Sequence, residues 1–483
     1  MTSSPYAYHA AGARPRPGTL HRLSQRWPGV PAQRGDLVAR LVAVFGLFFF
    51  SGSMVVVLTP EGAASSPKVQ AIGLALGLFS GLDFILRRGA IARSASLVWP
   101  ALIPIGFVIA SMMWSVDPAL SARRILGLLC ATSFALWLFE RFHDRGLFAL
   151  LAGAAILIVL SNVAVAIAVP SIGTHPALTE LGDPTPHVGT WRGLYDHKND
   201  FGRMMALCVM ILWIAYAARR SWRRSVGLGL LVGYLGVAGS TSGQAAFLSV
   251  AVPLLVRTIA LLRPLSPSRR AMVVAVSLPA LVTVYLFSQI VVTIVLGLLG
   301  KDPSLTGRTD IWLGTLMAMK GNMALGGGFG AGWGLVGERL LILTGIDVGH
   351  AHNGYLDLVT DLGVTGLLIL TVFYIGIFVS ALTAYFQDLA SETALLAAGI
   401  AAFALIGNWV ASFLILHNSI YWILPVLCVM SLRRARALQL PGALPGQTAT
   451  GFAPGWSLAA SGPARATARR GTSSPTPQRK ALS

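Results

Sequence analysis

Residues 349–384 read GHAHNGYLDLVTDLGVTGLLILTVFYIGIFVSALTA. The first nine residues hold two histidines, an asparagine and an aspartate, and no charged residue follows Asp361 until Asp388. Roughly 20 apolar residues are enough to cross the hydrocarbon core of a bilayer. The run 355–384 is therefore predicted to be a membrane span that tilts or begins outside the bilayer. A titratable cluster where such a span begins indicates chemistry or a pathway.

The composition extends this reading to the whole chain. Of 483 residues, 55% are hydrophobic and 11% are charged, and the mean hydropathy is +0.70. These values are typical of a polytopic membrane protein. Cys130, Cys208 and Cys428 lie in apolar runs without metal-ligand spacing, so neither disulfides nor a zinc site is expected. Arginine-rich cytoplasmic loops explain the net charge of +19, and nucleic acid is not an expected partner.

The apolar runs predict an all-α fold, a polytopic helical bundle of about twelve transmembrane helices. The predicted spans are 38–58, 68–86, 97–113, 125–139, 147–169, 201–217, 225–240, 244–262, 272–297, 355–384, 394–415 and 420–432.

Arginine placement predicts the orientation. Arginines fill alternate connections and follow the last span, whereas the connection 385–393 has no Lys or Arg. By the positive-inside rule the N-terminus is cytoplasmic, and the long loops 170–200 and 298–354 are periplasmic. The polar segments 1–36 and 433–483 are predicted to be disordered cytoplasmic tails that flank a membrane domain at 37–432. The arginines are Arg87, Arg88, Arg93, Arg141, Arg145, Arg219, Arg220, Arg223, Arg224, Arg257, Arg263, Arg269, Arg270, Arg433, Arg434 and Arg436.

The first outer loop ends in a group of cations. Arg192, Lys198 and Arg203 lie just before or inside the start of an apolar helix. Lys and Arg suit phosphate, and a helix start adds a favourable dipole, so one reading is an anion site. The other reading is contact with lipid headgroups plus a helix cap at Asn199 or Asp200. Cations are disfavoured on the outer side, which favours function.

The second outer loop holds Gly307, Arg308 and Trp312, followed by a glycine-rich run at 326–334. This run lacks the Gly-Lys-Ser/Thr of a phosphate-binding loop, so we expect a tight backbone path instead. Arg308 is predicted either to cap a neighbouring helix or to clamp a phosphate. Trp312 is read as an interfacial anchor or as a platform for a sugar.

The third polar group is His350, His352, Asn353, Asp357 and Asp361. In a helix that starts near His352, Asn353, Asp357 and Asp361 share one face. A histidine at a wet membrane surface can accept a proton from a hydroxyl. The plainer alternative is that Asn353 caps the helix and His352 lies among the headgroups.

Other chemistries have weaker support. His350 and His352 are two residues apart and lack a clear third ligand, so no metal is expected. No Asp-x-Asp motif occurs, and the segment 240–244 does not match the Gly-x-Ser-x-Gly elbow of hydrolases. Few acids lie deep in the predicted spans and no matching pair of broken helices is visible, which disfavours a transporter.

The ordered set of motifs resembles the O-antigen ligase and polysaccharide polymerase superfamily. Gly307, Arg308 and Trp312, the glycine-rich run, His352-Asn353-x-x-Leu356 and Asp361-Leu362-Gly363 carry the resemblance. Two further segments fit its exopolysaccharide-polymerase branch: Trp114 to Pro118 with Arg123 and Arg124 downstream, and His197-Lys198-Asn199 with Gly202 after it. The Ser240-Thr241-Ser242 turn is similar as well.

The resemblance implies a GT-C-like membrane glycosyltransferase in the bacterial inner membrane, with its active site facing the periplasm. The donor would be a glycan on undecaprenyl pyrophosphate, and inversion would proceed with neither metal nor cofactor. His352 would be the general base and Arg308 would hold the leaving group. The ligases often carry another Arg after the Ser-x-Ser turn, where this chain has Gly243 or Gln244.

That departure leaves the second phosphate ligand open, with Lys198 assigned first and Arg192 or Arg203 as substitutes. His350, Asn353, Asp357 and Trp312 complete the expected substrate-binding set.

Several functions remain open at this stage. The first is polymerisation of exopolysaccharide or O-antigen repeat units, and the second is a ligase that moves glycan to lipid A core or to a protein. A flippase of lipid-linked sugars and a structural scaffold are the readings from other classes. The expected partners are the lipid-linked donor, a glycan acceptor and the bilayer, with a chain-length regulator and a flippase of the same pathway as further candidates.

Overall fold

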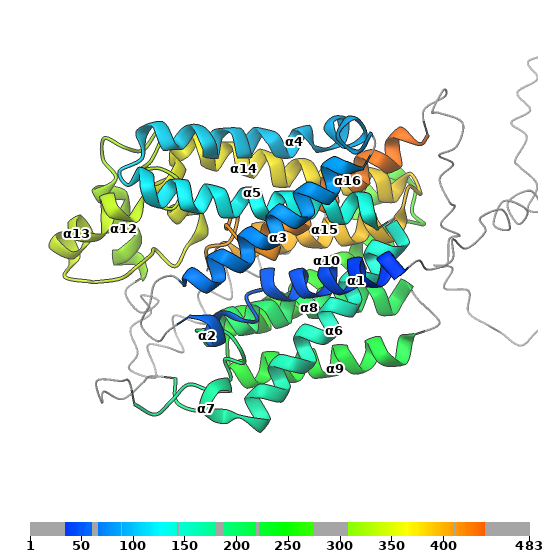
Figure 1. The fold of residues 1–483 in the computed structure, drawn as a ribbon, viewed down its shortest axis with the longest axis horizontal. Coiled ribbons are helices and arrows are strands. Elements are labelled where there is room, and N and C mark those ends of the chain that lie inside the picture. The colour runs from blue at the N-terminus through cyan, green and yellow to red at the C-terminus, as the bar shows by residue number, and fades with distance from the viewer. Residues whose placement is uncertain are drawn as a thin grey trace, which may run out of the picture. The chain divides into compact units, whose positions relative to one another are not determined.

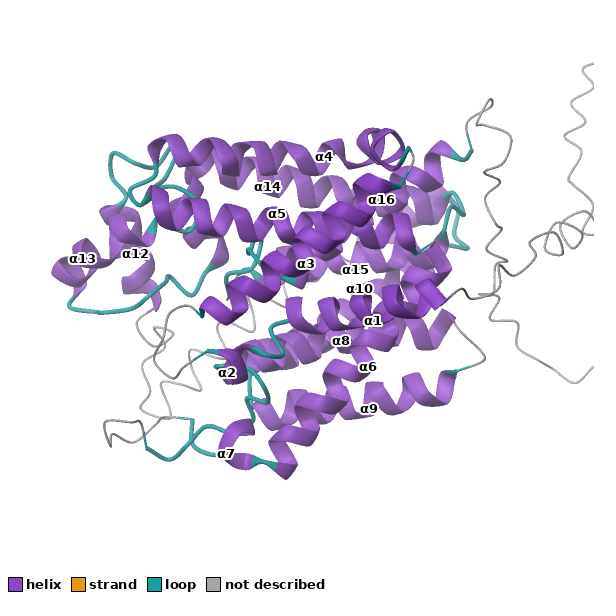
Figure 2. Ribbon diagram, viewed as in Figure 1, coloured by secondary structure: helices purple, strands orange, loops and turns teal. Residues whose placement is uncertain are grey.

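The computed structural model describes residues 34–59, 66–87, 89–142, 144–178, 187–218, 222–273, 308–409 and 411–439. This part of the chain is helical and contains no strand (Figure 2). A lone bridge pairs Thr174 with Trp191 between two loop segments. The prediction of an all-α protein is confirmed.

The helices follow the apolar runs closely. They are α1 Arg34–Phe50, α2 Val55–Leu58, α3 Pro67–Leu86, α4 Ala90–Ala110, α5 Pro118–Arg141, α6 Asp144–Ala168, α7 Pro170–Gly173, α8 Lys198–Ala218, α9 Arg223–Ser240, α10 Gly243–Leu262, α12 Arg308–Ala318, α13 Trp333–Thr344, α14 Gly354–Phe386, α15 Ser391–Gly407 and α16 Ile420–Ala437, with a short 3-10 turn at Ser111–Trp114 between α4 and α5.

Within the described residues, 7 helices are long and apolar enough to cross a membrane. They are α3, α4, α5, α6, α8, α10 and α14, and α1 and α15 are shorter apolar helices. The chain is therefore a multi-pass membrane protein, while the count of about twelve spans stays a prediction. The predicted span 272–297 lies outside the described residues except for its first two positions.

Two predicted boundaries differ from the structure. The run 394–415 was expected to be one span, but α15 ends at Gly407 and an irregular linker leads to α16. The described part of 298–354 carries two helices, α12 and α13, where a long loop was expected. Most of the two predicted tails lies outside the described residues, although α16 runs into the second one as far as Ala437.

Helix α8 lies inside the bundle. In its most apolar window 78% of the residues are buried, and it packs against α6, α9, α10 and α15. A helix that is apolar on all sides is expected to be buried on all sides. This position fixes the start of α8, which carries Lys198.

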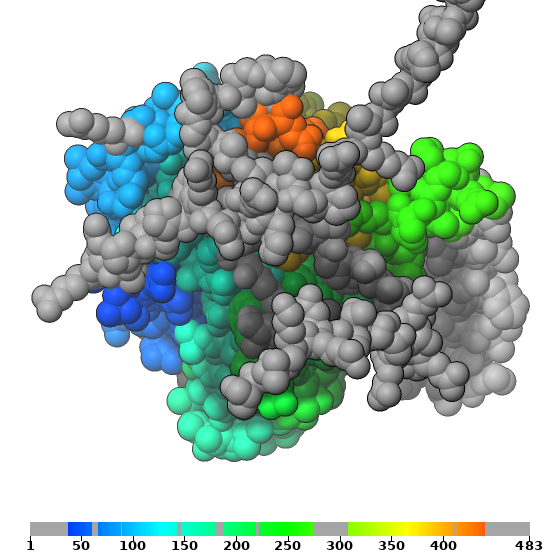
Figure 3. Space-filling model, turned by 90° about the vertical axis from the view of Figure 1, so that its right-hand side faces the viewer, coloured from blue at the N-terminus to red at the C-terminus, as the bar shows by residue number. Residues whose placement is uncertain are grey.

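The connections separate into two ends of the bundle. Figure 1 shows α2, α7, α12 and α13 at one end, while α1 begins and α16 finishes at the other. Figure 3 views this second end, with the start of α1 in blue and the end of α16 in orange. Arginine contacts gather here: Arg87 pairs with Asp83, Arg263 with Asp388, and Arg433 bonds to the Ser96 carbonyl.

Helix α14 is broken at Gly363, whose φ is 67° and ψ is −176°. The glycine-rich segment docks into the break. Gly327 N donates to the Thr360 carbonyl at 2.8 Å, and Val364 N donates to the Met323 carbonyl at 2.8 Å. Irregular backbone at membrane depth needs such partners, because no water is present to supply them.

The glycines of this segment are needed for close approach. A Cβ on Gly332 would lie 2.1 Å from the Thr360 carbonyl oxygen, closer than any real contact. The predicted tight backbone path at 326–334 fits this geometry. The predicted span 355–384 coincides with α14, and the break at Gly363 is a feature that the sequence did not predict.

Candidate active site

Lys198 lies on α8, Arg308 lies on α12, and His352 lies just ahead of α14. The charges of Arg308 and His197 both act on the imidazole of His352. Two segments that lie far apart in the sequence therefore approach the residue that the motifs singled out.

The turn that carries His352 is anchored by its neighbour. Ala351 is fully buried in a small core with Ile311, Val336 and Leu340 of α12 and α13. Trp312 Nε1 donates to the Ala351 carbonyl at 3.0 Å. The helical pair α12–α13 thus holds the backbone between His350 and His352, while both rings stay partly exposed.

His352 has a left-handed backbone, with φ at 52°. Few residues other than glycine adopt this conformation, and Asn, Asp and His are enriched among them. The His352 amide donates to Nδ1 of His350 at 3.1 Å, and the two ring centroids are 4.0 Å apart. Neither ring nitrogen of His352 has a hydrogen-bond partner within the described segments.

The pKa of His352 is lowered to about 4. Burial is the main cause, followed by electrostatic interactions with His350 and Arg308, while Asp357 acts in the opposite direction. Both burial and nearby cations disfavour the protonated ring. His352 is therefore a neutral imidazole with a free acceptor nitrogen at neutral pH.

Asp357 ties this turn to the linker between α15 and α16. Its Oδ1 accepts from Ala351 N at 2.7 Å, and its Oδ2 accepts from the Ser412 hydroxyl. His350 Nδ1 lies 3.6 Å from the same carboxylate. Through these contacts Asp357 positions the turn that carries His352. The substrate-binding role expected for Asp357 from the sequence stays a prediction.

Asn353 caps α14. Its side-chain oxygen accepts from Tyr355 N at 3.0 Å and from Leu356 N at 3.4 Å. The plainer alternative for this residue, a helix cap, matches the structure. The next residue, Gly354, has no room for a side chain, because a Cβ there would lie 2.2 Å from Asn408 Oδ1.

Arg308 is the first residue of α12 and is half-buried. In the described ranges its guanidinium has no hydrogen bond or ion pair. It is therefore not a cap for a described neighbouring helix. Its five N–H donors are free to bind an anion beside His352.

Lys198 has a different set of neighbours. Its ammonium lies 3.4 Å from the Thr241 hydroxyl in the Ser-Thr-Ser turn, and its amide donates to His175 Nε2 at 3.1 Å. The segment 197–199, which fits the exopolysaccharide branch, is thus in contact with the Ser-Thr-Ser turn at 240–242. The lysine is left with two further donors for a ligand.

A histidine cluster lies beside Lys198. The ring centroids of His175, His187 and His197 are 5.2 to 5.7 Å apart. Burial first, and then neighbouring cations, lower the pKa of His175 to about 4. Burial is also the main cause that lowers the pKa of His197. Sequence reasoning did not single out His175 or His187, although three of the nine histidines lie in this loop.

The two substitute phosphate ligands make contacts of their own. Arg192 Nε donates to the Ile172 carbonyl at 3.0 Å. Arg203 is buried, pairs with Asp200 and lies 5.0 Å over the ring of Phe413. These contacts hold the guanidinium of Arg203 at the start of α8.

The glycine-rich segment connects the site to α5. Arg124 donates to the Gly330 carbonyl, and Ser121 donates to the Phe329 carbonyl at 3.0 Å. Asp361 accepts from Gly332 N at 3.0 Å. The residues after Trp114 therefore act as supports for the loop that docks into α14.

No group of three His, Cys, Asp or Glu that could hold a metal ion occurs among the residues that the structure describes. His350 and His352 contact each other, and Asp357 lies beside His350, without forming such a group.

Comparisons with known proteins give two matches. Residues 226–371 match the family described as O-antigen ligase. The exopolysaccharide production protein ExoQ of Rhizobium meliloti (strain 1021) is 29% identical over 323 residues, which cover 62% of this chain and 69% of ExoQ. The family match includes Arg308 and His352 and excludes Lys198.

Proposed function

Because both matches support the O-antigen ligase and polymerase family, with similarity to ExoQ, we propose that this protein polymerises lipid-linked oligosaccharide repeat units. The donor is a glycan on undecaprenyl pyrophosphate, and the product is exopolysaccharide or O-antigen. The reaction takes place at the periplasmic face of the bacterial inner membrane.

The observation that carries the proposal is a neutral imidazole among cations. His352 has a pKa of about 4 because of burial, His350 and Arg308. A base must be unprotonated, whereas a pyrophosphate leaving group needs positive charge. In this proposal His352 meets the first requirement and the guanidinium of Arg308 meets the second.

The reaction follows from these two groups. The acceptor hydroxyl oxygen attacks the anomeric carbon of the donor sugar, and the bond from that carbon to the pyrophosphate oxygen breaks. His352 takes the hydroxyl proton on its free ring nitrogen. Undecaprenyl pyrophosphate leaves with the bonding electron pair, and Arg308 stabilises its added charge.

Lys198 is the second phosphate ligand in this proposal. Its neighbour His197 and Arg308 both act on the imidazole of His352, and Lys198 has donors left after its contact with Thr241. Arg203 is a weaker candidate because Asp200 and two aromatic rings already surround its guanidinium.

The charge distribution supports a periplasmic site. Arg87, Arg263 and Arg433 make their contacts at the end of the bundle opposite to His352. Positive charge gathers on the cytoplasmic side of membrane proteins. His352, on the other end, would then face the periplasm.

The second candidate is ligation of a glycan to lipid A core or to a protein. The match to the family described as O-antigen ligase favours it, while the similarity to ExoQ favours a role in exopolysaccharide production. The bond that forms is of the same kind in both cases, so the acceptor distinguishes them. A flippase and a chain-length regulator are proposed partners in either pathway.

The test uses purified protein in nanodiscs with defined lipid-linked repeat units. Wild type should give a ladder of glycan lengths on a gel, and His352→Asn should lose about 10²–10⁴-fold in rate. Asn tolerates the left-handed backbone of this position, so the variant removes the base with little strain. His187→Asn is the control and should keep the ladder.

Two results would overturn the proposal. A wild-type rate for His352→Asn would show that His352 is not the general base. A single transfer to lipid A core, with no ladder from the repeat unit alone, would replace polymerisation by ligation.

A further inference from the structure

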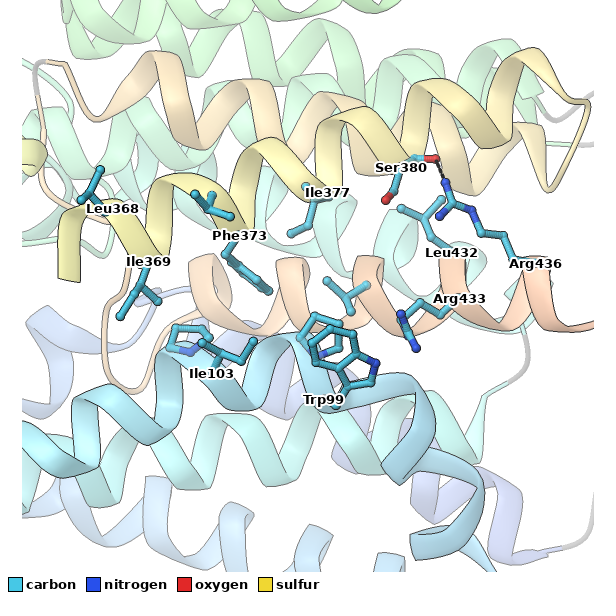
Figure 4. Close-up of a pocket in the computed structure, with 15 residues that line it drawn as sticks. Trp99, Ile103, Leu368, Ile369, Phe373, Ile377, Ser380, Leu432, Arg433 and Arg436 are labelled. Carbon is cyan, nitrogen blue, oxygen red and sulfur yellow. Dashed lines mark hydrogen bonds between the residues drawn. The ribbon is translucent and has the colours of Figure 1, made fainter. Parts of the chain in front are cut away.

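A lateral groove of about 500 Å³ lies between α4, α14 and α16 (Figure 4). It is separate from the site around His352, since its residues on α14 begin only after the break at Gly363. Its walls are apolar. Trp99 and Ile103 come from α4, Leu368 and Phe373 from α14, and Leu432 from α16.

The groove opens toward the surroundings of the bundle. Val372 is 68% exposed and Leu368 is 59% exposed, although both lie in an apolar span. A Cβ on Gly376 would have nothing within 4 Å. In a membrane protein, apolar side chains exposed along a span face lipid tails.

One end of the groove carries positive charge. Arg433 lies 5.1 Å over the ring of Trp99 and donates through Nε and Nη2 to the Ser96 carbonyl. Arg436 donates through Nη2 to the Ser380 carbonyl at 3.2 Å. Each guanidinium has five N–H donors, so most of them remain open to a ligand. No acidic residue lines the groove.

The length of the groove selects the occupant. On α14 its lining runs from Leu368 to Ser380, which is about 18 Å at the rise of an α-helix. One leaflet contributes about 15 Å of hydrocarbon. The apolar part therefore matches one acyl chain of one leaflet, whereas a long polyprenyl chain would extend beyond it.

We propose that this groove binds one anionic phospholipid from the leaflet at the arginine end. The headgroup phosphate accepts hydrogen bonds from Arg433 and Arg436, and one acyl chain lies along Phe373 and Leu368. Basic pockets between transmembrane helices are known to hold anionic headgroups. Trp99 lies where the apolar and charged parts meet, which suits an interfacial indole.

The first experiment fills the groove. Native mass spectrometry of delipidated wild type, titrated with phosphatidylglycerol, should show one lipid retained. Gly376→Leu should reduce that retention by about tenfold or more, since the new side chain occupies the acyl path. Gly106→Leu is the matched control: Gly106 is an exposed helical glycine with nothing within 4 Å, outside the groove. Equal retention in Gly376→Leu and wild type would overturn the proposal.

The second experiment removes the charge. Wild type should prefer phosphatidylglycerol over phosphatidylcholine with the same acyl chains. The double variant Arg433→Gln/Arg436→Gln should lose this preference by about tenfold, and Arg433→Lys/Arg436→Lys should keep part of it. The lysine pair keeps the proposal testable if the glutamine pair does not fold.

Competitors identify the source of the phosphate. Inorganic phosphate should not displace phosphatidylglycerol, because it cannot use the apolar walls. Displacement by inorganic phosphate would reduce the groove to an anion site. Tighter binding of undecaprenyl phosphate than of phosphatidylglycerol would assign the groove to a polyprenyl lipid, and either result rejects the proposal.

Discussion

At the scale of single residues, the main consequence concerns the protonation of His352. Its pKa of about 4 follows from burial first and from His350 and Arg308 next. Because the pKa is lowered, the ring stays neutral as the pH falls through the usual histidine range and becomes protonated only near pH 4. The rate of glycan extension should therefore be nearly flat between about pH 7 and pH 5 and should fall below that.

The measurement is the pH dependence of kcat/KM for the lipid-linked donor, because this ratio reports the pKa values of the free enzyme. In Arg308→Gln one cation near the ring is lost, so the acid limb should move to higher pH. A wild-type limb centred near the ordinary histidine pKa of 6.5 would contradict the geometry. The lipid composition and the detergent should be kept constant across the series.

Arg308 allows a second test at this scale. Arg308→Ala should reduce kcat/KM strongly, and Arg308→Lys should recover only part of it. A guanidinium binds two phosphate oxygens through parallel N–H bonds, whereas an ammonium acts as a point charge. Arg339→Ala is a suitable control, since that residue donates to the Ala318 carbonyl of the same helical pair. Full activity of Arg308→Ala would exclude it from the site.

The sequence could predict only part of this site. The cap at Asn353 and the cluster around His352 follow from local spacing. The contact from Ser412 to Asp357 does not, because Ser412 lies 55 residues further along the chain. The free guanidinium of Arg308 could not be predicted either, since its surroundings depend on how α12 and α13 pack.

At the scale of elements, the break in α14 deserves a direct test. Gly363 has φ at 67°, and a Cβ there would lie 2.2 Å from the Ala324 carbonyl oxygen. Gly363→Ala should therefore displace the glycine-rich segment and destabilise the protein by about 1–3 kcal/mol. Gly376→Ala, in the same helix but with open space around it, should change little.

Thermal unfolding in detergent, followed by fluorescence, compares the two variants. Equal midpoints would show that the break is not a constraint on the fold. The sequence predicted the span but not its break, because hydropathy records apolar content and not backbone angles. The partners that permit the break, such as Gly327 N on the Thr360 carbonyl, come from a separate segment.

At the scale of the whole molecule, hydropathy predicted the bounds of several helices, whereas the count of about twelve spans stays a prediction. The runs 68–86 and 147–169 coincide closely with α3 and α6. The run 394–415 does not coincide with one helix, because α15 ends at Gly407. Just after this end, Phe413 N donates to the side-chain oxygen of Asn408 at 2.7 Å. A hydropathy average does not detect a polar side chain that accepts hydrogen bonds from a linker backbone.

Cysteine labelling can test the orientation of the chain in the membrane. If the positive-inside rule holds, Gly349 lies outside and Ser268 lies inside. Both are exposed, and the three native cysteines are buried, so they give little background labelling. A membrane-impermeant maleimide should label Gly349→Cys in intact spheroplasts, because that position has open space around it. Ser268→Cys should react only after the membrane is permeabilised. The reverse pattern would place His352 on the cytoplasmic side and would remove the periplasmic reaction.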